Sequence, residues 1–360
     1  MVSFNCIMKR SINEANIIVE NDCRTIIDKI DLTPLKDKKI LITGGNGLFG
    51  RYILSTIALA NKEIDLNCSV LSLSLHKPPS DLMFLFEGNK RFSFLEVDLS
   101  KQFLLSDTYD YIFHAAGYAQ PAKFTTDPLS IISINVDSTR NLLEINKKSN
   151  GTFLYFSSSA VYGEVPREVN PIPETYNGNC STTRGRFVYA ESKRMGEALC
   201  GLYSDKFKSR VKIARISHTY GPGISIEDSR VLGEFLREAF IENKITLLDE
   251  GKSVKTFGYI SDMVKMLFHI VFYGVDMIYN VGGVDSMSIL DLANIIGKMC
   301  NVSVKTSQKI SKLEHIGQDP TLNRLDLSRI LKEIGNFSFT PFDEGIRRTI
   351  DWSKNMSNIE

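Results

Sequence analysis

The sequence contains no hydrophobic run long enough to cross a lipid bilayer. Its longest apolar stretch, at about residues 263–275, is interrupted by Lys265 and His269. It is also shorter than the roughly 20 apolar residues that a membrane-spanning helix needs. The first residues lack the continuous apolar segment of a secretory signal peptide. We therefore expect a cytoplasmic protein without a membrane anchor.

The sequence also lacks an excess of either charge sign, because 43 lysines and arginines face 42 aspartates and glutamates. The resulting net charge of +1 favours neither nucleic acid nor an anionic membrane as a partner. The six cysteines form no close pairs, so we expect free thiols, no disulfide framework and no metal site. They are Cys6, Cys23, Cys68, Cys180, Cys200 and Cys300. A chain of 360 residues with 43% hydrophobic residues suits one large domain with a smaller lobe.

Apolar segments alternate with helical patterns over the first 220 residues. We expect buried strands at 39–42, 70–75, 92–97, 111–114 and 153–156, and a helix at 48–59. This alternation predicts an α/β fold with a Rossmann-type, doubly wound parallel sheet. It ends near residue 221, beyond which amphipathic helices are expected at 231–242 and 289–299. We therefore expect an N-terminal extension at 1–38 with a short helix at about 21–30, and a dinucleotide-binding domain at 39–220. A mainly substrate-binding lobe at 221–360 would be interleaved with the end of the sheet.

Three glycines with a spacing of three residues separate the first expected strand from the first expected helix. The segment reads Gly44-Gly45-Asn46-Gly47-Leu48-Phe49-Gly50. In such a turn the first glycine allows the tight bend, the second lets the main chain approach a pyrophosphate, and the third permits close packing of helix on strand. The N-terminus of the following helix offers free N–H groups to phosphates. The segment therefore predicts a dinucleotide site.

Tyr189 and Lys193 lie one helical turn apart and suit proton transfer at the hydroxyl of a carbinol that exchanges a hydride. A phenol has an ordinary pKa near 10, and a lysine on the same helix face would lower it. A serine hydroxyl that hydrogen-bonds the reacting oxygen would complete the site, and Ser157, Ser158 and Ser159 all compete for that role.

The order of these motifs, together with His114-Ala115-Ala116-Gly117, resembles the extended short-chain dehydrogenase/reductase family, in its nucleotide-sugar branch. The resemblance runs from about residue 39 to about residue 352. Residues around the Tyr189 helix are similar to those of UDP-glucuronate decarboxylases. The resemblance implies a homodimer through the helices at about 128–146 and 189–203. It also assigns roles to individual residues: Ser158, Tyr189 and Lys193 for catalysis, Asp98 and Leu99 for adenine, His114, Ala115 and Ala116 beneath the cofactor ribose, and Ser159, His218, Arg230, Lys255 and Arg324 for substrate.

The chain departs from its relatives at positions that decide chemistry. Decarboxylases and 4,6-dehydratases of this family carry a glutamate two residues beyond the catalytic serine or threonine, and here that position is Ala160. NAD-preferring members carry an acidic residue at the end of the second strand, where this chain has Ser74. Ser74 with His76 and Lys77 could bind a ribose 2′-phosphate, so we expect NADP(H) to be preferred, with NAD(H) possible.

The main functional expectation is an NADPH-dependent reduction of a carbonyl group on a nucleotide-diphosphate sugar. The alternative is a tightly bound NAD in an internal redox cycle, as in a 4-epimerase or a UDP-glucuronate decarboxylase. A non-catalytic dinucleotide sensor is a third reading, which the intact Ser158, Tyr189 and Lys193 set disfavours.

Overall fold

A computed structural model describes residues 4–86, 88–118, 124, 126–306 and 324–357. A seven-stranded, wholly parallel sheet forms its centre, in the order β3-β2-β1-β4-β5-β6-β10. The strands are β1 (Lys39–Thr43), β2 (Ser69–Ser74), β3 (Phe92–Glu96), β4 (Tyr111–His114), β5 (Thr152–Ser158), β6 (Arg210–Ile216) and β10 (Ile278–Val281). The predicted Rossmann-type α/β fold is confirmed.

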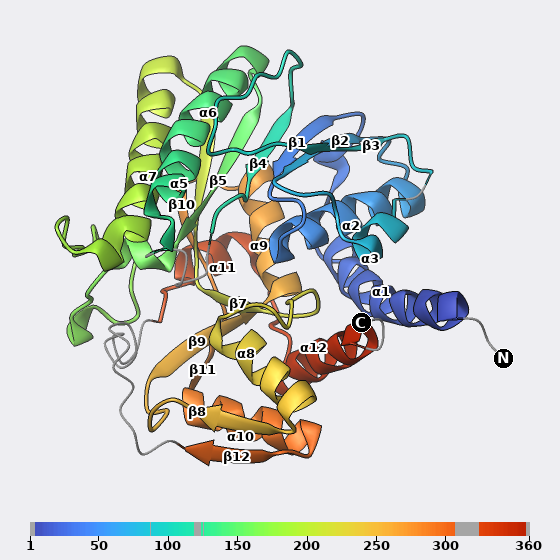
Figure 1. Cartoon of the computed structure of the whole chain (residues 1–360). Coiled ribbons are helices and arrows are strands. Elements are labelled where there is room, and N and C mark those ends of the chain that lie inside the picture. The colour runs from blue at the N-terminus through green and yellow to red at the C-terminus, as the bar shows by residue number, and fades with distance from the viewer. Residues whose placement is uncertain (1–3, 87, 119–123, 125, 307–323, 358–360) are drawn as a thin grey trace.

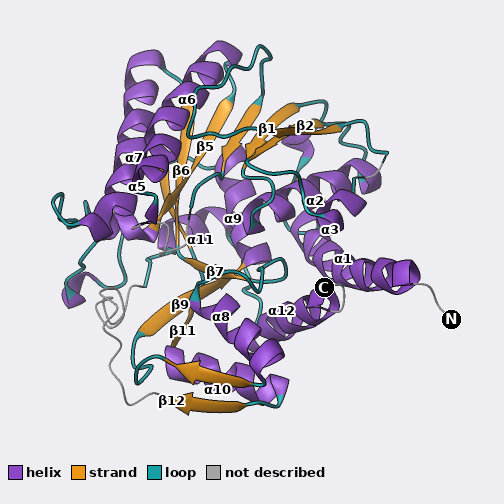
Figure 2. Ribbon diagram, in the orientation of Figure 1, coloured by secondary structure: helices purple, strands orange, loops and turns teal. Residues whose placement is uncertain are grey.

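Helices cover both faces of this sheet (Figure 2), and each face has its own hydrophobic core. On one face lie α2 (Leu48–Glu63), α3 (Ser80–Phe84), α9 (Ile260–Phe272) and α11 (Ser328–Ile334). On the other lie α5 (Pro128–Ile132), α6 (Ser138–Ser149) and α7 (Val188–Phe207). A π-helical turn at Ser133–Asp137 joins α5 to α6. The apolar stretch noted in the sequence is α9, whose residues are almost all buried against the sheet and neighbouring helices. Within the described ranges, no helix is long and apolar enough to cross a bilayer.

A smaller lobe lies below the large sheet in Figure 1. It holds a three-stranded sheet, of β7 (His218–Tyr220), β9 (Val254–Tyr259) and β11 (Asp285–Ser288), and a pair of parallel strands, β8 (Lys244–Leu247) and β12 (Ser303–Thr306). Helices α8 (Val231–Arg237), α10 (Ile289–Cys300) and α12 (Phe342–Ser357) complete it. Because β10 lies in the large sheet, the chain returns there from the lobe before it leaves again.

The N-terminal extension forms a helix much longer than the sequence indicated. Instead of a short helix at about 21–30, α1 covers Phe4–Ile27. Ala15, Val19, Cys23 and Ile26 form a fully buried stripe along it, at the spacing of one helix face. This face packs against α2, α9 and α12 (Figure 1). The sequence prediction missed most of α1 because the polar residues of its outer face hide the stripe.

Candidate active site

The glycine turn brings the main chain of β1 close to that of β4. Gly44 has a φ of 74°, and a Cβ placed on it would lie 2.8 Å from the Ala116 main chain. A Cβ on Gly50 would lie 2.3 Å from the Gly44 carbonyl oxygen. Side chains at these two positions would therefore force β1, α2 and the β4 end apart. The turn has the compact form that leaves room for a pyrophosphate above it.

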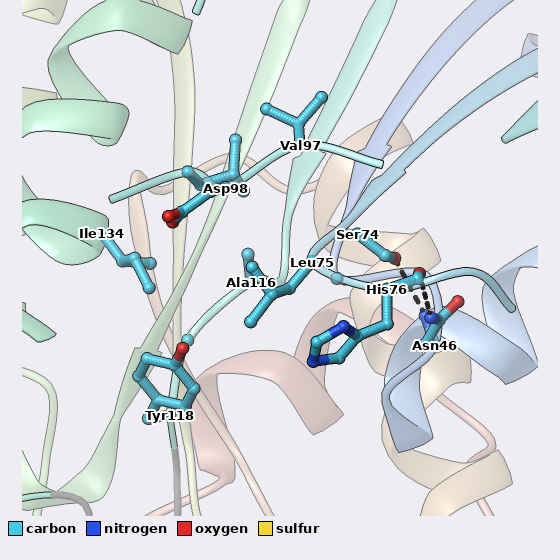
Figure 3. Close-up of a pocket in the computed structure, with 12 residues that line it drawn as sticks. Asn46, Ser74, Leu75, His76, Val97, Asp98, Ala116, Tyr118 and Ile134 are labelled. Carbon is cyan, nitrogen blue, oxygen red and sulfur yellow. Dashed lines mark hydrogen bonds between the residues drawn. The ribbon is translucent and has the colours of Figure 1, made fainter. Parts of the chain in front are cut away.

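A pocket of about 180 Å³ lies beside this turn, at the carboxyl ends of β2, β3 and β4 (Figure 3). Seven of the residues predicted to bind cofactor line it: Gly44, Asn46, Ser74, His76, Asp98, Leu99 and Ala116. Gly117, the last residue of the His114 motif, also lines it, and Leu75, Val97, Tyr118 and Ile134, which the sequence did not single out as binding residues, complete the lining. Its place at the carboxyl edge of a doubly wound sheet is where such folds bind nucleotides. The turn and the pocket together fit a dinucleotide.

Asn46 fixes the loop that follows β2. Its side-chain amide donates hydrogen bonds to the main-chain oxygens of His76, at 2.8 Å, and Lys77, at 3.1 Å. Its main-chain N–H points to Ser74 Oγ at 3.4 Å. Figure 3 shows Asn46 beside Ser74 and His76, with the hydrogen bonds to both drawn as dashed lines. The third residue of the glycine turn therefore sets the shape of the loop predicted to meet the adenine ribose.

Lys77 and His114 do not line the pocket. The Lys77 side chain is 85% exposed, and its ammonium lies 4.0 Å from the Glu96 carboxylate. His114 is wholly buried in the sheet, where its ring contacts the Thr43 hydroxyl at 2.7 Å and the Thr139 hydroxyl at 3.1 Å. Burial lowers the His114 pKa to about 3, with a further contribution from Lys193, so the imidazole is neutral. His114 therefore supports the turn from below instead of contacting a ligand with its ring.

Tyr189 and Ser158 meet at the carboxyl end of β5. Ser158 ends that strand, and its hydroxyl accepts the Ala160 main-chain N–H at 3.2 Å. Burial raises the Tyr189 pKa above its ordinary value of 10.0, while a hydrogen bond with Ser158 and the charge of Arg230 lower it. The phenol is therefore protonated at neutral pH and lies against the serine that the family resemblance implied.

Lys193 lies deeper than Tyr189, one turn farther along α7. It is only 3% exposed, and its ammonium donates to the Phe156 main-chain oxygen at 2.7 Å. Burial lowers the Lys193 pKa to about 7, against the opposing charge of Glu197. Arg230 contributes a positive charge that lowers the Tyr189 pKa. The expected effect of Lys193 on the phenol stays a prediction, and in this structure the Lys193 side chain is bound to β5.

A buried ion pair holds α7 against β6 beside the catalytic residues. The Arg215 guanidinium donates to both Glu197 oxygens, at 3.0 and 2.8 Å. The Ser157 hydroxyl donates to the same carboxylate at 2.5 Å. Ser157 is thus occupied by Glu197, which leaves Ser158 as the serine that contacts the phenol.

Phe124 stacks on the Tyr189 ring, with ring centres 4.6 Å apart and planes 8° from parallel. No local pattern in the sequence links these residues, which come from the loop after β4 and from α7. The contact restricts the Tyr189 ring to one orientation.

The residues predicted to bind substrate are only partly brought together. His218 and Arg230 line a small pocket of about 40 Å³ in the lobe. Lys255 lies on β9 two residues before Phe257, the register partner of His218, so all three share one face of the small sheet. Ser159 follows Ser158 directly. Arg324 is exposed, and its main-chain N–H donates to Asn170 Oδ1 at 3.1 Å.

Comparison with known proteins places the chain among enzymes that act on nucleotide sugars. The chain is 27% identical to UDP-glucuronic acid decarboxylase 1 of Xenopus tropicalis over 315 residues, which cover 88% of this chain and 72% of the relative. The fold matches dTDP-glucose 4,6-dehydratase from Streptomyces venezuelae, with NAD bound, at a TM-score of 0.74 and 20% identity, over 88% of this chain and 97% of that one. It also matches UDP-N-acetylglucosamine 4-epimerase from Methanobrevibacter ruminantium M1 at a TM-score of 0.74 and 23% identity, over 89% and 99% of the two chains.

The family model for "NAD dependent epimerase/dehydratase family" matches residues 40–282. This match covers the glycine turn, Ser158, Tyr189 and Lys193, and it confirms the resemblance inferred from the sequence. The protein is a nucleotide-sugar-modifying enzyme, and the chain belongs to the NAD dependent epimerase/dehydratase family.

Proposed function

We propose that the protein is a nucleotide-sugar 4-epimerase that works with a retained NAD. One observation carries the proposal: Ser158, Tyr189 and Lys193 are assembled for hydride chemistry, while Ala160 stands where decarboxylases and dehydratases of the family have a glutamate. Epimerisation needs one acid–base group, because the proton removed from a hydroxyl is returned to the same oxygen. Elimination needs a second group that acts on a neighbouring carbon.

NAD, when bound, supplies a hydride acceptor and donor. Tyr189 is a phenol in the dinucleotide-free chain, so it must first lose its proton; as the phenolate it would take the proton of the sugar hydroxyl while that carbon is oxidised, and as the phenol it would return that proton on reduction. The Ser158 hydroxyl donates a hydrogen bond to the reacting oxygen and so stabilises its partial negative charge. Lys193, whose ammonium donates to the Phe156 main-chain oxygen, would hold a ribose hydroxyl of the bound dinucleotide. Arg230, His218 and Lys255 would contact the diphosphate of the nucleotide sugar.

The second candidate is the NADPH-dependent carbonyl reductase. It is favoured by Ser74, which lines the pocket where NAD-preferring relatives have an acid, and by His76 beside it. Against it, Lys77 lies outside the pocket and close to Glu96, whose negative charge would disfavour a 2′-phosphate. The relatives also favour NAD, since the matching family is described as NAD dependent and the similar dehydratase has NAD bound.

The two candidates differ in the cofactor that remains on the purified protein. We expect about one NAD per chain to be released on denaturation, and turnover of UDP-sugars without added cofactor. Mass spectrometry of the released nucleotides measures this. Lys77→Ala should leave NAD retention unchanged. Freely exchanging NADPH, no retained NAD, and a loss of NADPH binding in Lys77→Ala would support the reductase instead.

We also propose a homodimer through α5 and α7. Leu129, Ile132, Met195 and Leu202 are exposed apolar residues on these helices, at 75%, 39%, 52% and 50%. Of the apolar residues expected there, Ile131, Ile134, Leu142 and Leu143 are buried within the chain, and the last three belong to the hydrophobic core on that face of the large sheet. Light scattering at micromolar concentration should give the mass of two chains, and Met195→Glu with Leu202→Glu should give one. A monomeric wild type would contradict the proposal.

A further inference from the structure

The Asp22 carboxylate, on the buried face of α1, lies where three parts of the chain meet. One oxygen, Oδ2, accepts hydrogen bonds from the hydroxyls of Tyr52, at 2.7 Å, and Tyr259, at 2.6 Å. The other, Oδ1, accepts from the Arg348 guanidinium at 2.6 Å. Asp22 is wholly buried, so these three partners replace water around it.

Each partner belongs to a different element. The first lies in the half built on the large sheet, and the other two lie in the half formed by the smaller lobe. Tyr52 is on α2, the helix that begins directly after the glycine turn. Tyr259 ends β9, the strand that carries Lys255 and pairs with the His218 strand. Arg348 is on α12, in the smaller lobe. One carboxylate therefore joins the cofactor helix to the sheet that carries the candidate substrate residues.

A buried ion pair is poor evidence of stability, because the cost of desolvation offsets the attraction between the charges. An apolar contact would hold α1 in place as well. A buried charged group does restrict how its neighbours are arranged, since other arrangements leave it without partners. The geometry at Asp22 therefore points to a role in fixing the relative position of the two halves.

A second set of contacts ties α1 to the cofactor side. The Asn16 side-chain amide donates to the Asp81 main-chain oxygen at 3.2 Å. The Asp81 carboxylate pairs with Arg51 on α2 at 2.6 Å, and both side chains are about 95% buried. Arg51 in turn lies over the ring of Trp352 on α12, 5.5 Å from its centre. The family model matches residues 40–282, and α1 lies outside that range.

We propose that α1 is an intramolecular brace and that Asp22 is a positioning residue. It couples dinucleotide binding at the α2 turn to nucleotide-sugar binding in the smaller lobe. The proposal rests on the proposed function for the identity of the second ligand. With the brace intact, occupation of one half favours the arrangement that binds the other ligand.

The test compares Asp22→Asn with a double variant, Asp22→Asn/Arg348→Gln, and with Asp28→Asn as the control. Asp22→Asn keeps the side-chain volume but removes the negative charge and one of the two oxygens that three donors share, so Arg348 keeps only Glu344 as its acidic partner. The double variant also removes the Arg348 cation and should regain thermal stability. Asp28 is exposed and lies just beyond the end of α1, so it leaves the brace intact.

Two measurements are made on protein stripped of dinucleotide. The first is the affinity for UDP and for TDP with and without saturating NAD⁺. We expect NAD⁺ to tighten nucleoside diphosphate binding about fivefold or more in wild type and Asp28→Asn, and less than about twofold in both Asp22 variants. The second is the emission of Trp352, the chain's one tryptophan, which is 5% exposed at the α2–α12 contact. We expect a red shift in both Asp22 variants.

Equal coupling in wild type and a folded double variant, with unchanged emission, would overturn the brace and leave Asp22 a merely structural residue. The brace is also overturned if NAD⁺ does not affect diphosphate affinity in wild type. Failure of wild type to bind either diphosphate would instead refute the proposed function, and the Trp352 emission would then decide the brace alone.

Discussion

Replacing Tyr189 with phenylalanine should lower kcat at least about a hundredfold, because the group that exchanges a proton with the sugar oxygen is lost. The phenylalanine ring keeps the stack on Phe124, so the fold and the retained NAD should survive. Turnover of UDP-sugars, circular dichroism and the nucleotide content of the variant measure the three quantities separately.

Two serine variants serve as internal controls for this result. Ser158→Ala removes a hydrogen bond to the reacting oxygen but leaves the proton donor, so its loss of activity should be smaller than that of Tyr189→Phe. Ser159→Ala should be the mildest, because Ser158 is the serine that contacts the phenol. Unchanged turnover in Tyr189→Phe would remove the central claim of the mechanism.

Replacing Lys193 with methionine should change how stability depends on pH. The Lys193 pKa falls from an ordinary 10.5 to about 7 in the folded chain because of burial. Between these values the unfolded chain binds a proton that the folded chain does not. Raising the pH therefore favours the folded state, by up to about 1.4 kcal/mol per pH unit from this one group. Below a pH of about 7, Lys193 is protonated in both the folded and the unfolded chain. Its contribution to the free energy of unfolding then no longer changes with pH and is at its least favourable.

Urea unfolding of dinucleotide-free protein at pH 7, 8 and 9 measures this effect. The free energy of unfolding of wild type relative to Lys193→Met should rise across the series. Lys148→Met, at an exposed position on α6, should follow the wild type. A constant difference between wild type and Lys193→Met would show that the ammonium is not desolvated as the structure implies.

The cofactor half could be predicted from sequence because its signals are local. A strand, three spaced glycines and a helix follow one another within 25 residues, at 39–63, and β4 has the bounds that were expected. The turn glycines are needed for contacts within β1, α2 and the end of β4, so their spacing carries the prediction. Most residues of the pocket could also be predicted, because they lie at the ends of consecutive strands.

The remaining features depend on partners that are distant in the sequence. Asp22 meets Tyr259 across 237 residues, and no pattern near either residue indicates the contact. The expected helix at 128–146 contains a π-helical turn at Ser133–Asp137, and the expected helix at 231–242 ends in another at Glu238–Glu242. Such turns interrupt a regular helix for reasons of packing, which helix periodicity does not report. Helix periodicity likewise did not predict that Ile131, Ile134 and Leu142 are buried within the chain, because their burial depends on elements distant in the sequence.

The return of the chain to the large sheet at β10 has a consequence for how the protein is made. One of the two edge strands of the sheet is β10, and it is synthesised only after β7, β8 and β9 of the smaller lobe. During synthesis on the ribosome, the first half of the chain therefore emerges with one side of β6 unpaired. An unpaired strand edge invites pairing with another chain. A fragment that ends near residue 220 should aggregate, and the nascent chain should depend on chaperones until residue 281 has emerged.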